Sequence, residues 1–135
     1  MVPEQRFVAI VDDDPSFVEM IQLALALEGH QSISCRCGPD AHVLVQQQQP
    51  DVVMLDLREQ SLDAGWQVLE ALRRDPATRA IPVIVSAGDA GLLREREQQL
   101  RAYGCAILLK PYALGALLAA IDRQVCSGRG GGAGA

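Results

Sequence analysis

Five short strand-like runs alternate with five helical patterns along this chain, and this alternation limits the folds that it can adopt. The runs cover residues 7–11, 31–35, 51–57, 81–86 and 105–111, and all except the weaker second run are strongly apolar. Short apolar runs of this kind indicate strands that are buried on both faces of a sheet. Because such strands are joined through helices by right-handed crossovers, the sequence predicts an α/β fold with a doubly wound parallel sheet.

Turn-forming residues mark where the helices begin and end. Pro15 suits the first turn of a helix that has Asp14 as its N-cap, and Gly29 ends that helix. Residues 57–64 are mostly polar and predict a loop, after which the third helix resumes at Gly65. Apolar spacing therefore predicts helices within residues 15–28, 41–49, 65–74, 92–103 and 114–125.

Length and charge exclude several classes of protein. The 135 residues fit one domain, which we place at residues 1–126, and the glycine-rich residues 127–135 predict a flexible tail or linker. The net charge of −5 argues against direct binding of nucleic acid, because contact with phosphates needs clustered Lys and Arg. No apolar run is long enough to span a bilayer and no secretory segment is visible, so we expect a cytoplasmic protein with reduced cysteines.

Polar side chains stand at or just after the ends of four of the five runs. The carboxyl ends of parallel strands meet on one side of a sheet, where ligands bind in doubly wound folds. We call this side the carboxyl end of the sheet, and we expect five polar side chains to gather there. They are Asp12, Asp13, Asp56, Ser86 and Lys110.

The chemistry of this set indicates phosphoryl transfer assisted by a metal ion. Crowded carboxylates repel one another unless a cation joins them. Mg²⁺ suits the set because it binds one or two carboxylates, keeps several waters and shares oxygens with a phosphoryl group. A hydroxyl and a lysine beside it would neutralise and position the transferred group, with Asp56 as the nucleophile that forms an aspartyl phosphate.

The order of these motifs resembles the receiver domain of two-component response regulators. The resemblance rests on Asp12-Asp13, Asp56, Ser86-Ala87-Gly88 and Lys110-Pro111 and extends from about Phe7 to Cys126. It implies a flavodoxin-like, five-stranded parallel sheet with strand order 2-1-3-4-5 and five helices. It also implies a signalling phosphoacceptor domain rather than an enzyme, one that catalyses only its own phosphorylation and slow dephosphorylation.

The resemblance further implies a role for each site residue. Asp56 would accept the phosphoryl group from a sensor histidine kinase or a histidine phosphotransfer protein. Mg²⁺, or Mn²⁺, would be bound by Asp56, directly by Asp13, through water by Asp12, and by the backbone carbonyl of Arg58. Ser86 and Lys110 would contact phosphoryl oxygens, and the Lys110-Pro111 bond is expected to be cis. A downstream effector domain or protein and a phosphorylation-dependent homodimer remain open.

Two positions depart from the usual pattern of this family. Receivers usually carry a proline where this chain has Gln60, and the segment from Glu59 to Gly65 is about one residue longer than usual. Many receivers also place an aromatic residue three positions before the lysine, where this chain has Ile107. The coupling between hydroxyl and aromatic residue is therefore not expected here in its usual form.

Two alternatives compete with the phosphoacceptor hypothesis. The Asp-x-Asp pattern also occurs in haloacid-dehalogenase-type phosphatases, with Asp12 as nucleophile and Asp14 as general acid. That family needs a further acidic pair, for which this chain offers only Asp122, and it leaves Asp56 unexplained. The other alternative is a pseudo-receiver that keeps the fold and signals through protein contacts without phosphorylation.

Overall fold

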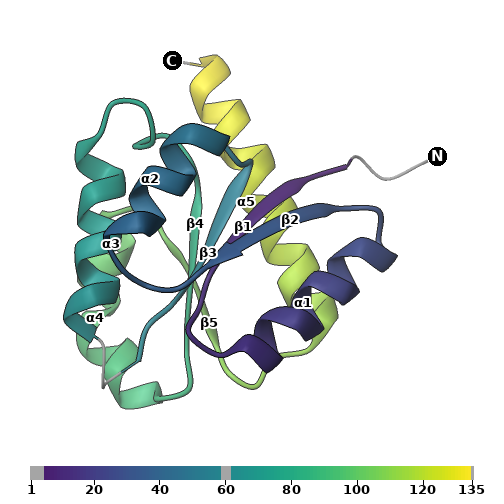
Figure 1. Cartoon of the computed structure of the whole chain (residues 1–135). Helices are drawn as coiled ribbons and strands as arrows, with labels where there is room; N and C mark the ends of the chain where they lie inside the picture. The colour runs from purple at the N-terminus through teal and green to yellow at the C-terminus, as the bar shows by residue number, and fades with distance from the viewer. Residues whose placement is uncertain (1–4, 59–61, 135) are drawn as a thin grey trace.

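A computed structural model describes residues 5–58 and 62–134, with side chains through residue 126. Five parallel strands form one sheet between two layers of helices (Figure 1). The strands are β1 (Phe7–Val11), β2 (Gln31–Cys35), β3 (Val52–Asp56), β4 (Val83–Ala87) and β5 (Ala106–Leu109). The helices are α1 (Pro15–Leu27), α2 (Pro39–Gln48), α3 (Leu62–Arg74), α4 (Ala90–Ala102) and α5 (Leu114–Gly134). The predicted α/β class is confirmed.

The strand order is β2-β1-β3-β4-β5, as the resemblance implied. All four neighbouring pairs are parallel. The register places Ala9 of β1 between Ile33 of β2 and Val53 of β3, and it places Asp56 of β3 beside Ser86 of β4. This register therefore places the carboxyl ends of β3 and β4 side by side.

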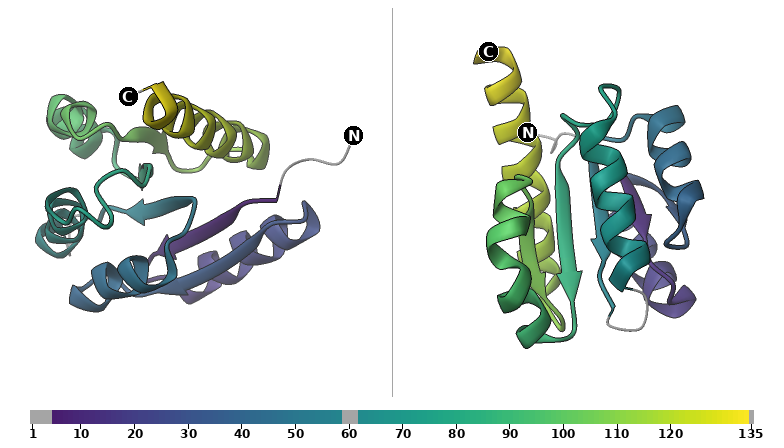
Figure 2. Two further views of the ribbon diagram at one scale, coloured as in Figure 1. Left: turned by 90° about the horizontal axis from the view of Figure 1, so that it is seen from above. Right: turned by 90° about the vertical axis from the view of Figure 1, so that its left-hand side faces the viewer.

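Successive residues of each strand point to opposite faces of the sheet, and each face has its own core. Val8 and Ile10 lie in the core with α1 and α5, whereas Ala9 and Val11 lie in the core with α2, α3 and α4. Figure 1 shows the corresponding division of the helices on the two sides of the sheet, and Figure 2 shows the layers from two further directions. Burial on both faces explains why the strands read as continuous apolar runs.

Local signals set the ends of the helices. The Asp14 carboxylate accepts hydrogen bonds from the N–H groups of Ser16 and Phe17, so its predicted role as the N-cap of α1 is confirmed. Gly29 and Gly104 follow α1 and α4 with φ of 86° and 76°, a left-handed backbone that favours glycine. The Lys110-Pro111 bond is cis, as expected.

The start of the third helix differs from the prediction. We expected a loop through Ala64, but α3 begins at Leu62, and residues 59–61, which include Gln60, lie outside the described part of the chain. Leu62 packs against the core and Asp63 lies in the first turn, where a negative charge is favourable. The polar composition of this segment predicted a loop, but packing of Leu62 against the core favours a helical turn.

The backbone of α5 continues through Gly134, and in Figure 2 its end extends beyond the sheet. This helix includes most of the residues predicted as a flexible tail, and the division into a domain of residues 1–126 and a tail stays a prediction. Over the described residues, no helix combines the length and the apolar character needed to cross a bilayer.

Candidate functional site

Two buried carboxylates lie at the centre of the carboxyl end of the sheet. Asp12 follows β1, and Asp56 is the last residue of β3, the neighbouring strand. Their side chains are only 2% and 4% exposed. Ser86 is buried on the next strand and pairs in register with Asp56. Sequence reasoning thus placed these three residues together correctly.

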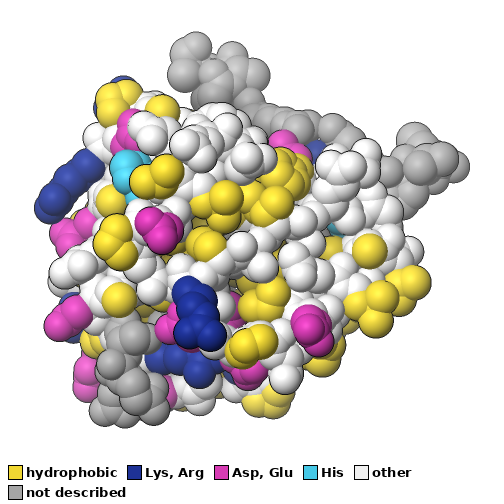
Figure 3. All heavy atoms as spheres, in the orientation of Figure 1, with side chains coloured by type: hydrophobic (Ala, Val, Ile, Leu, Met, Phe, Trp, Pro, Cys, Tyr) yellow, Lys and Arg dark blue, Asp and Glu magenta, His cyan; other side chains and the backbone are white. Residues whose placement is uncertain are grey.

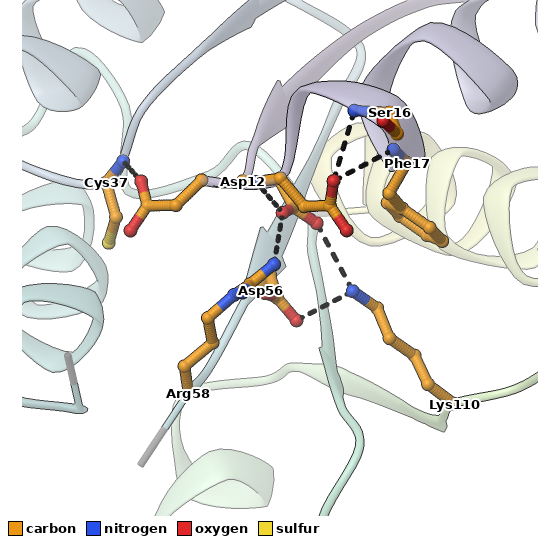
Figure 4. A network of polar contacts seen from close by, with 9 residues as sticks. Asp12, Ser16, Phe17, Cys37, Asp56, Arg58 and Lys110 are labelled. Carbon is orange, nitrogen blue, oxygen red and sulfur yellow. Dashed lines mark hydrogen bonds and ion pairs between the residues drawn. The ribbon is translucent and has the colours of Figure 1, made fainter. Parts of the chain in front are cut away.

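Lys110 brings a positive charge to both carboxylates from the end of β5. Its Nζ lies 3.0 Å from Asp56 Oδ1 and 3.3 Å from Asp12 Oδ2 (Figure 4). The same Nζ lies 3.9 Å from the centroid of the Phe17 ring, whose face attracts cations. The ammonium group is therefore held between two anions and an aromatic ring.

Arg58 supplies a second positive charge to the same two carboxylates. Its Nε donates to Asp56 Oδ2 at 2.7 Å, and its Nη2 donates to Asp12 Oδ1 at 3.1 Å (Figure 4). The hydrogen bond with Asp56 raises the pKa of the Arg58 guanidinium, so the group stays charged. Two cations thus balance two anions, and the repulsion expected between the carboxylates is offset by the chain itself.

The carboxylates of Asp13 and Asp14 accept hydrogen bonds from backbone N–H groups and make no ion pair with Lys110 or Arg58 among the described residues. The Oδ1 atom of Asp13 accepts the backbone N–H of Cys37 at 2.8 Å, and Asp14 caps α1. The structure therefore does not bring Asp13 together with Asp12 and Asp56, although the three were expected as metal ligands. Within the described residues, no three Asp, Glu, His or Cys side chains form a group that could hold a metal ion.

The donor set nevertheless fits a hard divalent cation. Carboxylate oxygens such as those of Asp12 and Asp56 are the ligands that Mg²⁺ prefers. Asp56 lines a cavity of about 400 Å³ together with Arg58, Lys110 and six neighbouring residues of the same end of the sheet. Figure 3 shows acidic and basic side chains next to one another on this part of the surface. The cavity is large enough to admit a small phosphorylated molecule.

Sequence reasoning missed the side chains of Arg58 and Phe17. Arg58 was expected to contribute only its backbone carbonyl, yet its guanidinium contacts both carboxylates. The signal was present: side chains two positions apart in an extended segment point to the same side, so Arg58 follows Asp56. Phe17 could not be found in this way because its contact with Lys110 joins α1 to the end of β5.

Tyr112 is a further residue near the site that the sequence left without a role. Its ring meets the Phe17 ring edge to face, with centroids 6.3 Å apart. Its hydroxyl is buried and has no hydrogen-bond partner among the described residues. Burial raises the pKa of Tyr112 to about 12, and the negative charges of Asp12 and Asp56 act in the same direction.

Comparisons with known proteins agree with this geometry. The chain is 31% identical over 114 residues to the DNA-binding dual master transcriptional regulator RpaA of Synechocystis. The matched segment covers 84% of this chain and 46% of RpaA. The chain is 41% identical over 80 residues to Protein PilH of Pseudomonas aeruginosa, covering 58% of this chain and 64% of PilH. The matched segments thus span less than two thirds of these relatives.

Solved structures show the same fold. The N-terminal domain of a response regulator receiver protein from Methanoculleus marisnigri JR1 has a TM-score of 0.69 and 30% identity, covering 87% of this chain and 94% of that one. The receiver domain of sensor histidine kinase PA1611 from Pseudomonas aeruginosa, which has a magnesium ion in its active-site cleft, has a TM-score of 0.76. It is 22% identical, covers 90% of this chain and 98% of that one, and supports the fold alone.

The family model of the response regulator receiver domain matches residues 8–122. That range runs from Val8 in β1 into the first half of α5 and contains every residue of the charged cluster at the carboxyl end of the sheet. The chain therefore belongs to the response regulator receiver domain family.

Proposed function

We propose that this chain is a phosphoacceptor in two-component phosphorelay signalling, with Asp56 as the residue that accepts the phosphoryl group. The observation that carries the proposal is the position of Asp56: its carboxylate lies at the end of β3, borders the 400 Å³ cavity and is 3.0 Å from Lys110 Nζ. The phosphodonor is a sensor histidine kinase or a histidine phosphotransfer protein, and this chain receives the phosphoryl group in the cytoplasm. Membership of the receiver family supports this class of partner.

In the proposed reaction an oxygen of Asp56 attacks the phosphorus atom of a phosphohistidine. The new O–P bond forms as the P–N bond breaks, and the electron pair of the broken bond stays on the histidine nitrogen. Lys110 then pairs with one phosphoryl oxygen, and the Ser86 hydroxyl donates to another. Hydrolysis of the acyl phosphate by water restores Asp56, so the domain's own catalysis is limited to its phosphorylation and slow dephosphorylation.

Mg²⁺ or Mn²⁺ is the proposed cofactor of this reaction. Asp12, Asp13, Asp56 and the backbone carbonyl of Arg58 are the proposed ligands, and the bound ion would supply charge neutralisation on the transferred group. Asp12 and Asp56 already lie together, whereas Asp13 accepts the Cys37 N–H and is the ligand that must change partner. Chelation of divalent ions is therefore expected to prevent phosphorylation.

Phosphorylation is proposed to act as a switch. A phosphoryl group adds negative charge beside Lys110, which follows β5, and beside Ser86, which belongs to β4. Their new bonds favour one of two arrangements of the surfaces around α4 and β5, which an effector domain, another protein or a second copy of the chain reads. Ile107 packs against the core at the position where many receivers carry an aromatic residue, so this switch works without that side chain.

The phosphatase alternative gains no support from the structure. Its proposed general acid, Asp14, is engaged as the N-cap of α1. Its only further acid, Asp122, is 65% exposed on α5 and lies 3.7 Å from Arg6. Neither carboxylate therefore supplies the free acid that the phosphatase mechanism needs beside Asp12.

Mass spectrometry after incubation with acetyl phosphate and Mg²⁺ tests the proposal. We expect one phosphoryl adduct on Asp56, lost on addition of a chelator before the donor and absent from Asp56→Asn. An adduct on Asp12 would instead support the phosphatase alternative. If neither acetyl phosphate nor beryllofluoride modifies Asp56, the result favours the pseudo-receiver alternative.

A further inference from the structure

We propose that the Arg58 side chain is a built-in counter-cation that competes with Mg²⁺ for Asp12 and Asp56 and so sets the metal concentration at which this receiver becomes active. This inference rests on the proposed function, because it concerns regulation of the same site. It adds a role for a side chain that was otherwise expected to contribute only its backbone carbonyl.

The hydrogen bonds of Arg58 occupy the oxygens that a metal ion would need. Arg58 takes Asp56 Oδ2 at 2.7 Å and Asp12 Oδ1 at 3.1 Å, while Lys110 takes the other oxygen of each carboxylate, Asp56 Oδ1 and Asp12 Oδ2. All four carboxylate oxygens therefore have a cationic partner. An ion that binds these carboxylates therefore competes with both side chains for the same oxygens.

Exposure identifies Arg58 as the cation that leaves. The Arg58 side chain is 37% exposed and can move into water, where a guanidinium is well solvated. Lys110 is 19% exposed and is also held by the Phe17 ring. Moving Lys110 would break a contact with an aromatic ring as well as two ion pairs, so displacement of Arg58 costs less free energy.

Charge balance gives the physical reason for exclusion. With Arg58 and Lys110 in place, the two carboxylates are neutralised. Adding a divalent cation would leave the cluster with two excess positive charges, or one if Asp13 joins as a third carboxylate. Release of Arg58 with Asp13 present restores neutrality, so metal binding and the inward position of Arg58 exclude each other.

The position of Arg58 in the chain makes this competition local. Its backbone carbonyl is a proposed metal ligand, and its side chain blocks the same site. The carbonyl can serve the metal only after the guanidinium has turned outward. At low metal concentration the site is thus neutral and closed by its own arginine, and at higher concentration it opens for phosphoryl transfer.

Isothermal titration calorimetry with MgCl₂ on wild type and Arg58→Met tests this inference without any phosphodonor. Methionine keeps an unbranched apolar stem and removes the guanidinium. We expect Arg58→Met to bind Mg²⁺ at least about tenfold more tightly, since each of the two charge-assisted hydrogen bonds that it lacks corresponds to a factor of about that size. The matched control is Arg94→Met, which removes the same charge from an exposed position of α4, and its affinity should equal that of wild type.

Chemical unfolding provides a second readout. With a chelator present, Arg58→Met should be less stable than wild type because one of the two cations that neutralise the carboxylates is gone. Saturating Mg²⁺ should raise its unfolding midpoint by more than it raises that of wild type, as tighter binding to the folded state requires. If Arg58→Met does not fold, Arg58→Lys replaces it, and we expect Mg²⁺ affinity between those of wild type and a variant without the charge.

The outcomes separate this inference from the proposed function. If Arg58→Met, or Arg58→Lys in its place, binds Mg²⁺ as tightly as wild type or more weakly while wild-type Asp56 is labelled normally, the inference is overturned and the phosphoacceptor function stands. Absence of Mg²⁺ binding in wild type and variants, together with no labelling, would overturn both. Tighter binding by Arg58→Met and unchanged binding by Arg94→Met would support the competition.

Discussion

At the end of the sheet where the strands begin, hydrogen bonds that involve backbone groups hold neighbouring strands together. The N–H of Phe7 donates to Asp51 Oδ2 at 2.8 Å, and the N–H of Asp51 donates to the carbonyl of Phe7 at 2.8 Å. The Arg6 N–H donates to His30 Nδ1, and the Arg6 carbonyl accepts from Gln31. Backbone groups take part in every one of these bonds, so they stabilise the positions of β1, β2 and β3.

The carboxyl end of the same sheet is built from side chains that share partners. Asp12 and Asp56 each contact both Lys110 and Arg58. Side-chain pairs can exchange without moving a strand, whereas pairs that involve the backbone cannot. The comparison indicates that one end of the sheet provides stability, and that the other holds charges in an arrangement that a ligand can replace.

The strongest test of this comparison replaces, one at a time, Asp56 at the end of β3 and Asp51 directly before its start. Asp56→Asn should abolish phosphoryl uptake from acetyl phosphate, because an amide is not a competent nucleophile, while leaving the circular dichroism spectrum unchanged. Asp51→Asn should retain uptake, since its side chain serves the backbone of Phe7. Uptake at position 56 in the first variant, or its loss in a folded second variant, would break the distinction between the two ends.

The next test concerns the packing that supports the carboxyl end. A Cβ added at Gly65 would lie 2.7 Å from Leu57 Cδ2, and Leu57 is fully buried directly after Asp56. We expect Gly65→Ala to lower the free energy of unfolding by about 1–3 kcal/mol, as overpacking does. Urea denaturation measures this change.

Gly115 offers a matched control for that substitution. A Cβ at Gly115 of α5 meets no atom within 4 Å. Alanine favours a helix by up to about 1 kcal/mol relative to glycine, so Gly115→Ala should be neutral or stabilising. Equal destabilisation by both variants would show that the space around Gly65 is not the cause.

A smaller effect is expected from the unpaired hydroxyl of Tyr112. A buried polar group without a partner reduces stability, so Tyr112→Phe should raise the free energy of unfolding by about 1 kcal/mol in thermal or urea denaturation. Tyr103→Phe, which changes a half-buried ring beside Trp66, should have an effect near zero. A loss of stability in Tyr112→Phe alone would mean that the hydroxyl makes a favourable bond.

The last expected effect has no influence near neutral pH and is visible only at alkaline pH. The pKa of Tyr112 is raised from 10.0 to about 12 in the folded chain, so the unfolded chain loses this proton first as pH rises. Stability from this group is complete below pH 10 and is lost between about pH 10 and 12. Burial also raises the pKa of the Cys35 and Cys105 thiols from 9.0 to about 11. Their contribution to stability is therefore lost between about pH 9 and 11.

Unfolding midpoints measured from pH 8 upward check this expectation. Tyr112→Phe should show a shallower decline than wild type above about pH 10 because it has no phenol to ionise. The decline that begins near pH 9 should be the same in both proteins, since it arises from the thiols. Identical curves over the whole range would contradict the raised pKa of Tyr112.

Much of the fold and part of the site could be predicted from local patterns. Apolar runs located the strands, and Asp14 marked the start of α1 because an N-cap acts within its own turn. Asp12, Asp56, Ser86 and Lys110 could be grouped because strand ends in a parallel sheet converge. The predicted start of α3 was wrong because packing of Leu62 against distant parts of the chain favours a helical first turn there.

The different directions of the adjacent Asp12 and Asp13 side chains could not be predicted from the sequence. Asp12 and Asp13 are adjacent, yet Asp12 contacts Lys110 and Arg58 while Asp13 contacts the backbone of Cys37 in the segment after β2. That choice depends on which donors the other strands bring near each carboxylate. The sequence alone determined which residues reach the carboxyl end of the sheet, because strand and helix periodicities are local. Only the tertiary structure decided that Arg58 would share two carboxylates with Lys110, because ion pairs form between whichever charges the folded chain places within reach.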